Sequence, residues 1–108
     1  MSTVVEKFER MLARGKDSAL LRYSLGTEYL KIDDDTRALE HLAQAVVLDR
    51  EYSAAWKLYA KVLVKVERAA EAMEAYRTGI EVAKAKGDLQ SAKEMGVFLR
   101  RLEKNATP

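Results

Sequence analysis

Residues 53–79, SAAWKLYAKVLVKVERAAEAMEAYRTG, share their pattern of large and small side chains with the segment before them. Moving back by about 34 positions usually preserves side-chain size, and a period of that length is typical of stacked helical repeats. The positions that match in size are Ala60 with Gly26, Leu63 with Tyr29, Ala72 with Ala38, Tyr76 with Leu42, and Gly79 with Ala45. The pattern predicts pairs of helices that stack on one another rather than a single closed core.

Composition agrees with a folded, all-helical chain. The 108 residues are 48% hydrophobic and 33% charged, with a single proline at position 108. This predicts one domain over residues 1–108. The chain has no cysteine, so disulfides and thiolate chemistry are excluded. Charged residues interrupt the N-terminal segment and no long apolar run follows, so we expect a cytoplasmic protein without a signal peptide or membrane span.

Apolar periodicity and capping residues predict about six helices. They cover residues 3–14, 18–32, 36–48, 53–66, 69–86 and 88–104. The first helix forms an N-terminal half repeat, residues 18–49 and 53–86 form two full repeats, and residues 88–104 form a capping helix. Expected helix starts are Thr3, Asp17 or Ser18, Asp34 or Asp35, and Ser53, and expected stops are Gly15 and Gly87. Residues 105–108 are expected to fray.

The two repeats follow a recognisable motif. They read R-x2-L-G-x2-Y-x8-A-x3-L-x2-A from Arg22 to Ala45 and W-x2-Y-A-x2-L-x8-A-x3-Y-x2-G from Trp56 to Gly79. In these residues the chain resembles the tetratricopeptide repeat family. The resemblance implies an α-helical solenoid of antiparallel helix pairs, in which Trp56 is a packing residue. If a short insertion is allowed before the last helix, Gly96 aligns with Gly26 of the first repeat.

Three residues depart from the family pattern. Arg22 replaces an aromatic residue, and Arg50 and Lys84 replace prolines. We therefore expect the turns between repeats to be looser or to be extended by helix.

The resemblance also implies a binding groove lined by the first helix of each pair. Its positions correspond to Leu20, Tyr23, Thr27 and Leu30, to Ala54, Lys57, Lys61 and Val64, and to Gln90, Lys93, Val97 and Arg100. The best candidates are Tyr23, Thr27, Leu30, Lys57, Lys61, Val64, Lys93, Val97 and Arg100. Lys57, Lys61 and Lys65 also lie on one helix face by their spacing, either as a binding face or as a solvated one. Apolar and cationic groups together suit a peptide that bears acidic residues.

Some family members grip a chaperone's terminal carboxylate with lysine and asparagine at the positions of Tyr23 and Thr27. The residue types here do not support that clamp.

Residues for catalysis, metals or cofactors are not apparent. His41 is the only histidine and is expected at the surface, without a metal partner. The run Asp33 to Asp35 lacks the glycine and glutamate of a calcium loop. The sequence therefore predicts a non-enzymatic module that binds a protein or peptide.

The charge distribution bears on two other functions. A self-assembling scaffold is the alternative, in which the acidic first half of one copy meets the basic last helix of another. The net charge of +2 argues against a nucleic-acid ligand.

Overall fold

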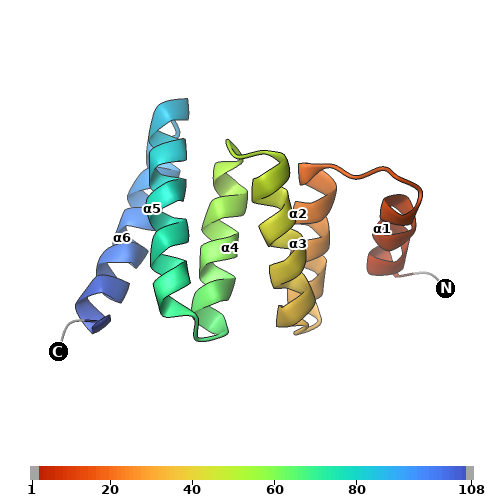
Figure 1. Cartoon of the computed structure of the whole chain (residues 1–108), viewed down its shortest axis with the longest axis horizontal. Coiled ribbons are helices and arrows are strands. Elements are labelled where there is room, and N and C mark those ends of the chain that lie inside the picture. Colours follow the sequence, from red (N-terminus) through yellow and green to blue (C-terminus); the bar gives the residue numbers. More distant parts are fainter. Residues whose placement is uncertain (1–2, 107–108) are drawn as a thin grey trace. The chain divides into compact units, whose positions relative to one another are not determined.

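The computed structural model describes residues 3–106, which form six α-helices and no strand. The helices are α1 (Val4–Ala13), α2 (Ala19–Lys31), α3 (Asp35–Leu48), α4 (Ser53–Lys65), α5 (Ala69–Lys86) and α6 (Leu89–Ala106) (Figure 1). The predicted all-α class is confirmed. Residues 105 and 106 are helical rather than frayed, and residues 107–108 lie outside the described range. No helix within residues 3–106 is long and apolar enough to cross a membrane.

The helices fall into two compact units, which are described separately. The first unit ends at Asp49 and contains α1, α2 and α3, whereas the second begins at Arg50 and contains α4, α5 and α6. In each unit, consecutive helices pack on each other: α1 on α2, α2 on α3, α4 on α5 and α5 on α6.

Helix starts follow the capping residues with one exception. Thr3, Ser18 and Asp34 each accept a hydrogen bond from the backbone N–H three residues ahead. Ser53, the predicted cap of α4, is instead the first helical residue, and Tyr52 precedes it without a side-chain cap. The Ser53 hydroxyl donates to Asp88 Oδ2 at 2.9 Å, so it ties α4 to the start of α6. The prediction failed because a partner distant in sequence engages the hydroxyl.

The turn inside each full repeat has the same backbone geometry. Asp33 and Glu67, at equivalent repeat positions, are the two non-glycine residues with positive φ in the described chain, 59° and 63°. The next backbone N–H then donates five residues back, from Asp34 to Tyr29 O at 2.9 Å and from Arg68 to Leu63 O at 2.8 Å. The turn therefore repeats in geometry although neither residue is glycine, which the sequence did not reveal.

The first unit packs around α2. Leu21, Leu25, Tyr29 and Ala38 form its buried cluster. Partly buried residues that pack on this cluster are Val5, Phe8, Leu12 and Leu30. Gly26 allows α2 and α3 to approach closely, since a Cβ added there would lie 2.6 Å from Leu42 Cγ. No residue of α1 is fully buried, so this helix is the most lightly held of the three.

The second unit packs around Trp56 on α4. Its side chain is 8% exposed, and its indole N–H donates to Arg50 O at 2.8 Å. The Arg50 guanidinium lies 5.8 Å from the ring centroid, at the position where the family pattern has proline. A Cβ added at Gly79 on α5 would lie 2.9 Å from Trp56 Cβ and 2.7 Å from Met95 Sδ on α6. Three helices therefore meet at Gly79, and Trp56 is a packing residue as predicted.

Two glycines provide a matched test of this packing. We expect Gly79→Ala to lower the free energy of unfolding by about 1–3 kcal/mol, because the new methyl meets Trp56 Cβ, which is fixed by its own backbone. Gly96→Ala should instead raise it by up to about 1 kcal/mol, since alanine favours helix and the position is open. Urea denaturation followed by circular dichroism measures both, and equal effects would contradict the packing described.

Candidate functional site

A hollow of about 270 Å³ opens to solvent in the second unit. Its lining residues come from α4, α5 and α6, and they are Lys61, Val64, Tyr76, Phe98, Arg101, Leu102 and Asn105. The Tyr76 and Phe98 rings stack in it, with centroids 5.9 Å apart and an interplanar angle of 14°. Burial raises the pKa of the Tyr76 phenol, so this ring stays neutral near pH 7. The hollow therefore offers an apolar, aromatic surface.

Cations border this apolar surface. The Arg101 guanidinium lies 5.7 Å from the Phe98 ring centroid, and Lys61 is exposed without an ion pair in the described chain. Lys57, one turn before Lys61, forms an ion pair with Glu94 at 3.1 Å. Both side chains of that pair are about a third or more exposed, and such pairs contribute only about 0–1 kcal/mol. A ligand carboxylate can therefore compete for Lys57 at little cost.

The structure brings together part of the predicted set. Lys61 and Val64 line this hollow, and Lys57 lies on the same side of α4, facing α6 through its ion pair. Lys93 and Arg100 instead line a different hollow between α5 and α6. Val97 is half-buried and lines neither hollow.

Sequence reasoning missed the residues that α6 contributes to the first hollow. Phe98 and Arg101 line the hollow, and Glu94, which pairs with Lys57, precedes Phe98 by four positions, so the three residues form one helical stripe visible in the sequence. Nothing in the sequence shows that this stripe, rather than the adjacent one with Lys93 and Arg100, faces α4. The choice depends on how α6 rotates to bury Ala92 and Met95.

The predicted residues Tyr23, Thr27 and Leu30 lie on α2 in the first unit. Each is half-buried. The Thr27 hydroxyl donates to Tyr23 O at 3.0 Å, and Leu30 packs against the core cluster. Leu20, a further groove position, is 66% exposed.

His41 is buried, which corrects the expectation of a surface histidine. It is 8% exposed and stacks on Tyr29, with centroids 5.5 Å apart and rings 3° from parallel. Its Nδ1 lies 3.2 Å from Arg22 Nη1, and its Nε2 lies 3.5 Å from Glu9 Oε1. The reason is Arg22: because it replaces an apolar residue at the anchor position of its repeat, it requires buried polar partners.

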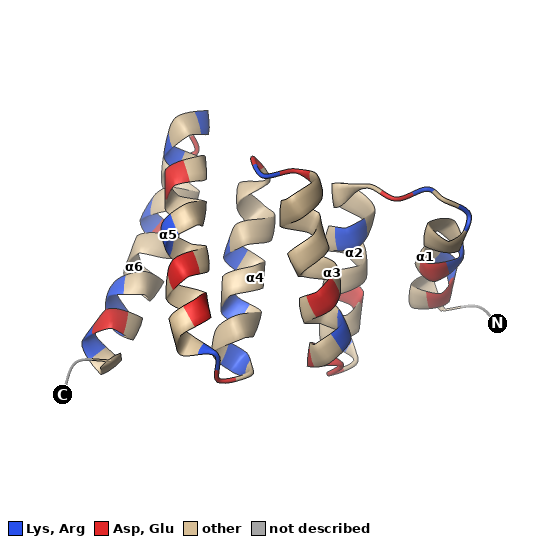
Figure 2. Ribbon diagram, in the orientation of Figure 1, with Lys and Arg blue, Asp and Glu red and all other residues tan. Residues whose placement is uncertain are grey.

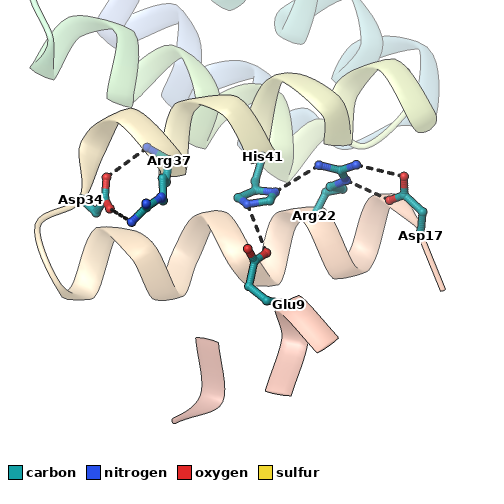
Figure 3. A network of polar contacts seen from close by, with 6 residues as sticks. All are labelled: Glu9, Asp17, Arg22, Asp34, Arg37 and His41. Atoms are coloured by element: carbon teal, nitrogen blue, oxygen red, sulfur yellow. Dashed lines mark hydrogen bonds and ion pairs between the residues drawn. The ribbon is translucent and has the colours of Figure 1, made fainter. Parts of the chain in front are cut away.

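Polar contacts at His41 link all three helices of the first unit (Figure 3). Glu9 comes from α1, Arg22 from α2 and His41 from α3, and Asp17 precedes α2. Asp17 accepts from Arg22 Nε at 2.9 Å and from Nη2 at 3.1 Å. Since arginine only donates, His41 Nδ1 must accept and the proton of the neutral ring lies on Nε2, facing Glu9. An enclosed ring held in this way is placed for structure rather than for proton transfer.

The charges around His41 shift the pKa of its imidazole in opposite directions. Burial lowers the pKa of the imidazole most, and Arg22 lowers it further, while Glu9, Glu40 and Asp17 raise it. The net effect is a lowered pKa, so the folded chain favours the neutral ring. Within residues 3–106, no three His, Asp or Glu side chains gather closely enough to hold a metal ion.

Comparisons with known proteins give a consistent fold. No protein-family model matches the sequence. The chain is 45% identical to a TPR repeat-containing protein of Pseudomonas aeruginosa over 104 residues, which are 96% of this chain and 99% of that protein. It resembles the solution structure of protein BPP2914 from Bordetella parapertussis, with 41% identity, a TM-score of 0.80, and 97% and 91% of the two chains covered.

A more distant neighbour carries a ligand. The second TPR domain of human RPAP3, solved in complex with the HSP70 peptide SGPTIEEVD, is 24% identical with a TM-score of 0.69. The match covers 85% of this chain and 78% of that one. At this identity the likeness concerns the fold.

The His41 contacts predict a pH-dependent stability. Below about pH 6.5, the ordinary histidine pKa, the unfolded chain binds a proton that the folded chain resists, so the free energy of unfolding should fall as pH falls. The hydrogen bond from Arg22 holds the pKa of Asp17 below its ordinary value, which confines the effect of that carboxyl to more acidic solution. Urea denaturation from about pH 8 to about pH 5 measures the slope.

The control for this prediction is His41→Gln, which removes the titrating ring. Its unfolding free energy should change less with pH over the same range. An NMR titration of the single histidine in the unaltered protein gives its pKa directly, independently of whether the variant folds. A folded-state pKa above the ordinary value would contradict the assignment.

Proposed function

Because this chain belongs to the tetratricopeptide repeat family, we propose that it is a cytoplasmic, non-enzymatic interaction module whose second unit binds an acidic peptide. The binding surface is the hollow between α4 and α6, with Val64 and Phe98 as its exposed apolar part, Phe98 resting on the buried Tyr76 ring, and Lys61 and Arg101 as its cations. The observation that carries the proposal is that Phe98, stacked on Tyr76, lies beside two cations for which residues 3–106 provide no carboxylate partner.

The chemistry of the hollow defines the ligand. A space of about 270 Å³ walled by Val64, Phe98 and Leu102 suits one medium-sized apolar side chain. Carboxylates on either side of that side chain would meet Lys61 and Arg101. Lys57 would become available when its exposed pair with Glu94 opens. A short segment with a leucine or phenylalanine between acidic residues satisfies all of these groups.

The RPAP3 peptide provides a comparison for this ligand. It contains two glutamates and ends in aspartate. In the present chain Tyr23 and Thr27 stand where the family's carboxylate clamp has lysine and asparagine, so we do not assign it that clamp. We propose instead that internal acidic residues are recognised, through Lys61 and Arg101.

A catalytic role is not part of the proposal. The single histidine is buried, stacked on Tyr29 and engaged by Arg22.

Charge reversal tests the proposed function. The probe is a short, fluorescently labelled peptide with one central leucine flanked by glutamates, and its binding is followed by anisotropy. We expect Lys61→Glu combined with Arg101→Glu to weaken binding by about tenfold or more, which corresponds to about 1.4 kcal/mol. Binding to the unaltered protein should also weaken as salt is added.

The matched control is Lys93→Glu combined with Arg100→Glu. It makes the same change in net charge, but both of its substitutions are on α6 and outside the hollow. The affinity for the short peptide should stay within about twofold of that of the unaltered protein. The reason is that charges outside the hollow act on the peptide mainly through weak fields screened by salt. Equal losses in both double variants would show that the peptide responds only to net charge, and the proposal would fail.

A further inference from the structure

A second hollow lies between α5 and α6. It measures about 390 Å³ and is lined by Ile80, Lys84, Leu89, Ala92, Lys93, Gly96, Leu99 and Arg100, with no residue from α4. On α6, the lining positions 92, 96 and 99 lie on nearly the opposite side of the helix from positions 98, 101 and 105 of the first hollow. The two hollows therefore occupy different faces of the second unit.

The first helix pair of this same chain shows what such a face accepts. Gly96 is the repeat equivalent of Gly26. A Cβ added at Gly26 would collide with Leu42 of α3, because that leucine sits directly over the glycine. A Cβ added at Gly96 would meet only Arg100 Nη1, at 3.4 Å. The space that a partner helix fills in the α2–α3 pair is thus open beside α6.

The charged residues that line the open space are all cations. Lys84, Lys93 and Arg100 are exposed and line the hollow, and none forms an ion pair within the described chain. Among the described residues, no carboxylate belongs to the lining, and Glu103, one turn beyond Leu99, is paired with Arg77. Lys and Arg recur along α6 as they do along α4 (Figure 2). The apolar floor includes Leu89, which is 68% exposed.

We propose that the α5–α6 face docks an acidic amphipathic helix of a partner protein, with one leucine-sized or aromatic side chain over Gly96. Carboxylates flanking that side chain pair with Lys84, Lys93 and Arg100. The docked helix takes the place that α3 holds on α2. This site is separate from the peptide hollow and does not depend on it.

A second copy of the chain is the obvious competitor for this face, through α1. That helix exposes the side chains of Val4 and Met11, which are 47% and 40% exposed to solvent. Lys7 and Arg14, however, follow these residues at helical spacing and flank the same stripe. Cations would then face Lys84, Lys93 and Arg100, and like charges across an interface oppose association. The charges therefore favour an acidic partner over self-assembly through α1.

The test uses a synthetic amphipathic helix with a leucine stripe flanked by glutamates, long enough to be helical in solution. Its binding is followed by anisotropy, and its site is mapped by backbone amide NMR shifts. We expect shifts centred on α5 and α6 near Gly96. Gly96→Leu, which fills the open space, and Lys93→Glu combined with Arg100→Glu should each weaken binding about tenfold or more.

Controls separate this site from the peptide hollow and from simple charge attraction. Lys61→Glu combined with Arg101→Glu should leave binding of the helix within about twofold. Replacing the central leucine of the probe by alanine should weaken it about tenfold. Shifts centred on Phe98 and Arg101, or no effect of Gly96→Leu in a variant whose circular dichroism shows it folded, would overturn the inference. So would concentration-dependent dimerisation that Gly96→Leu abolishes, because the occupant would then be a second copy.

Discussion

Close approach of helix backbones at small residues is the constraint on which the structure depends. At Gly26 and at Gly79 even one added carbon would collide with a neighbouring helix, so large side chains can interlock only because these positions are empty. Leu42 fills the space over Gly26, and Trp56 with Met95 fills the space over Gly79. The same rule explains the open face of α6: Gly96 keeps the small residue of the repeat, but no described helix supplies the large one.

The two repeats satisfy this constraint with different chemistry. In the second, Trp56 is the buried anchor, and Ala75 stands at the position equivalent to His41. In the first, Arg22 takes the place of tryptophan and is accompanied by His41, Asp17 and Glu9. Glu9 Oε1 faces His41 Nε2 at 3.5 Å, and the Glu9 side chain is 43% exposed. This contact gives α1, which buries few apolar groups, an electrostatic link to α3 that depends on the protonation of one ring.

The two proposed binding surfaces follow from the rotation of α6 about its axis. One of its faces joins Lys61 and Tyr76 around an aromatic hollow, and the other carries Lys93 and Arg100 around an open apolar space. The Lys and Arg residues of α6, seen in the sequence alone, would have suggested one uniformly basic helix rather than two separate surfaces. Because Phe98 and Arg101 lie on a different side of α6 from Gly96 and Leu99, the helix borders two hollows, and we propose a single apolar side chain as the occupant of one and a helix as the occupant of the other.

The sequence by itself determined the helices, the caps Thr3, Ser18 and Asp34, and the repeat register, because these depend on local propensity and on a periodic placement of small and large residues. The family, the all-α fold and the packing role of Trp56 could therefore be predicted. Only the tertiary structure decided which stripe of α6 faces α4, why Ser53 binds Asp88 and why His41 is buried. Each of these depends on a partner distant in sequence, and a helix with several polar stripes does not reveal which one its neighbours will meet.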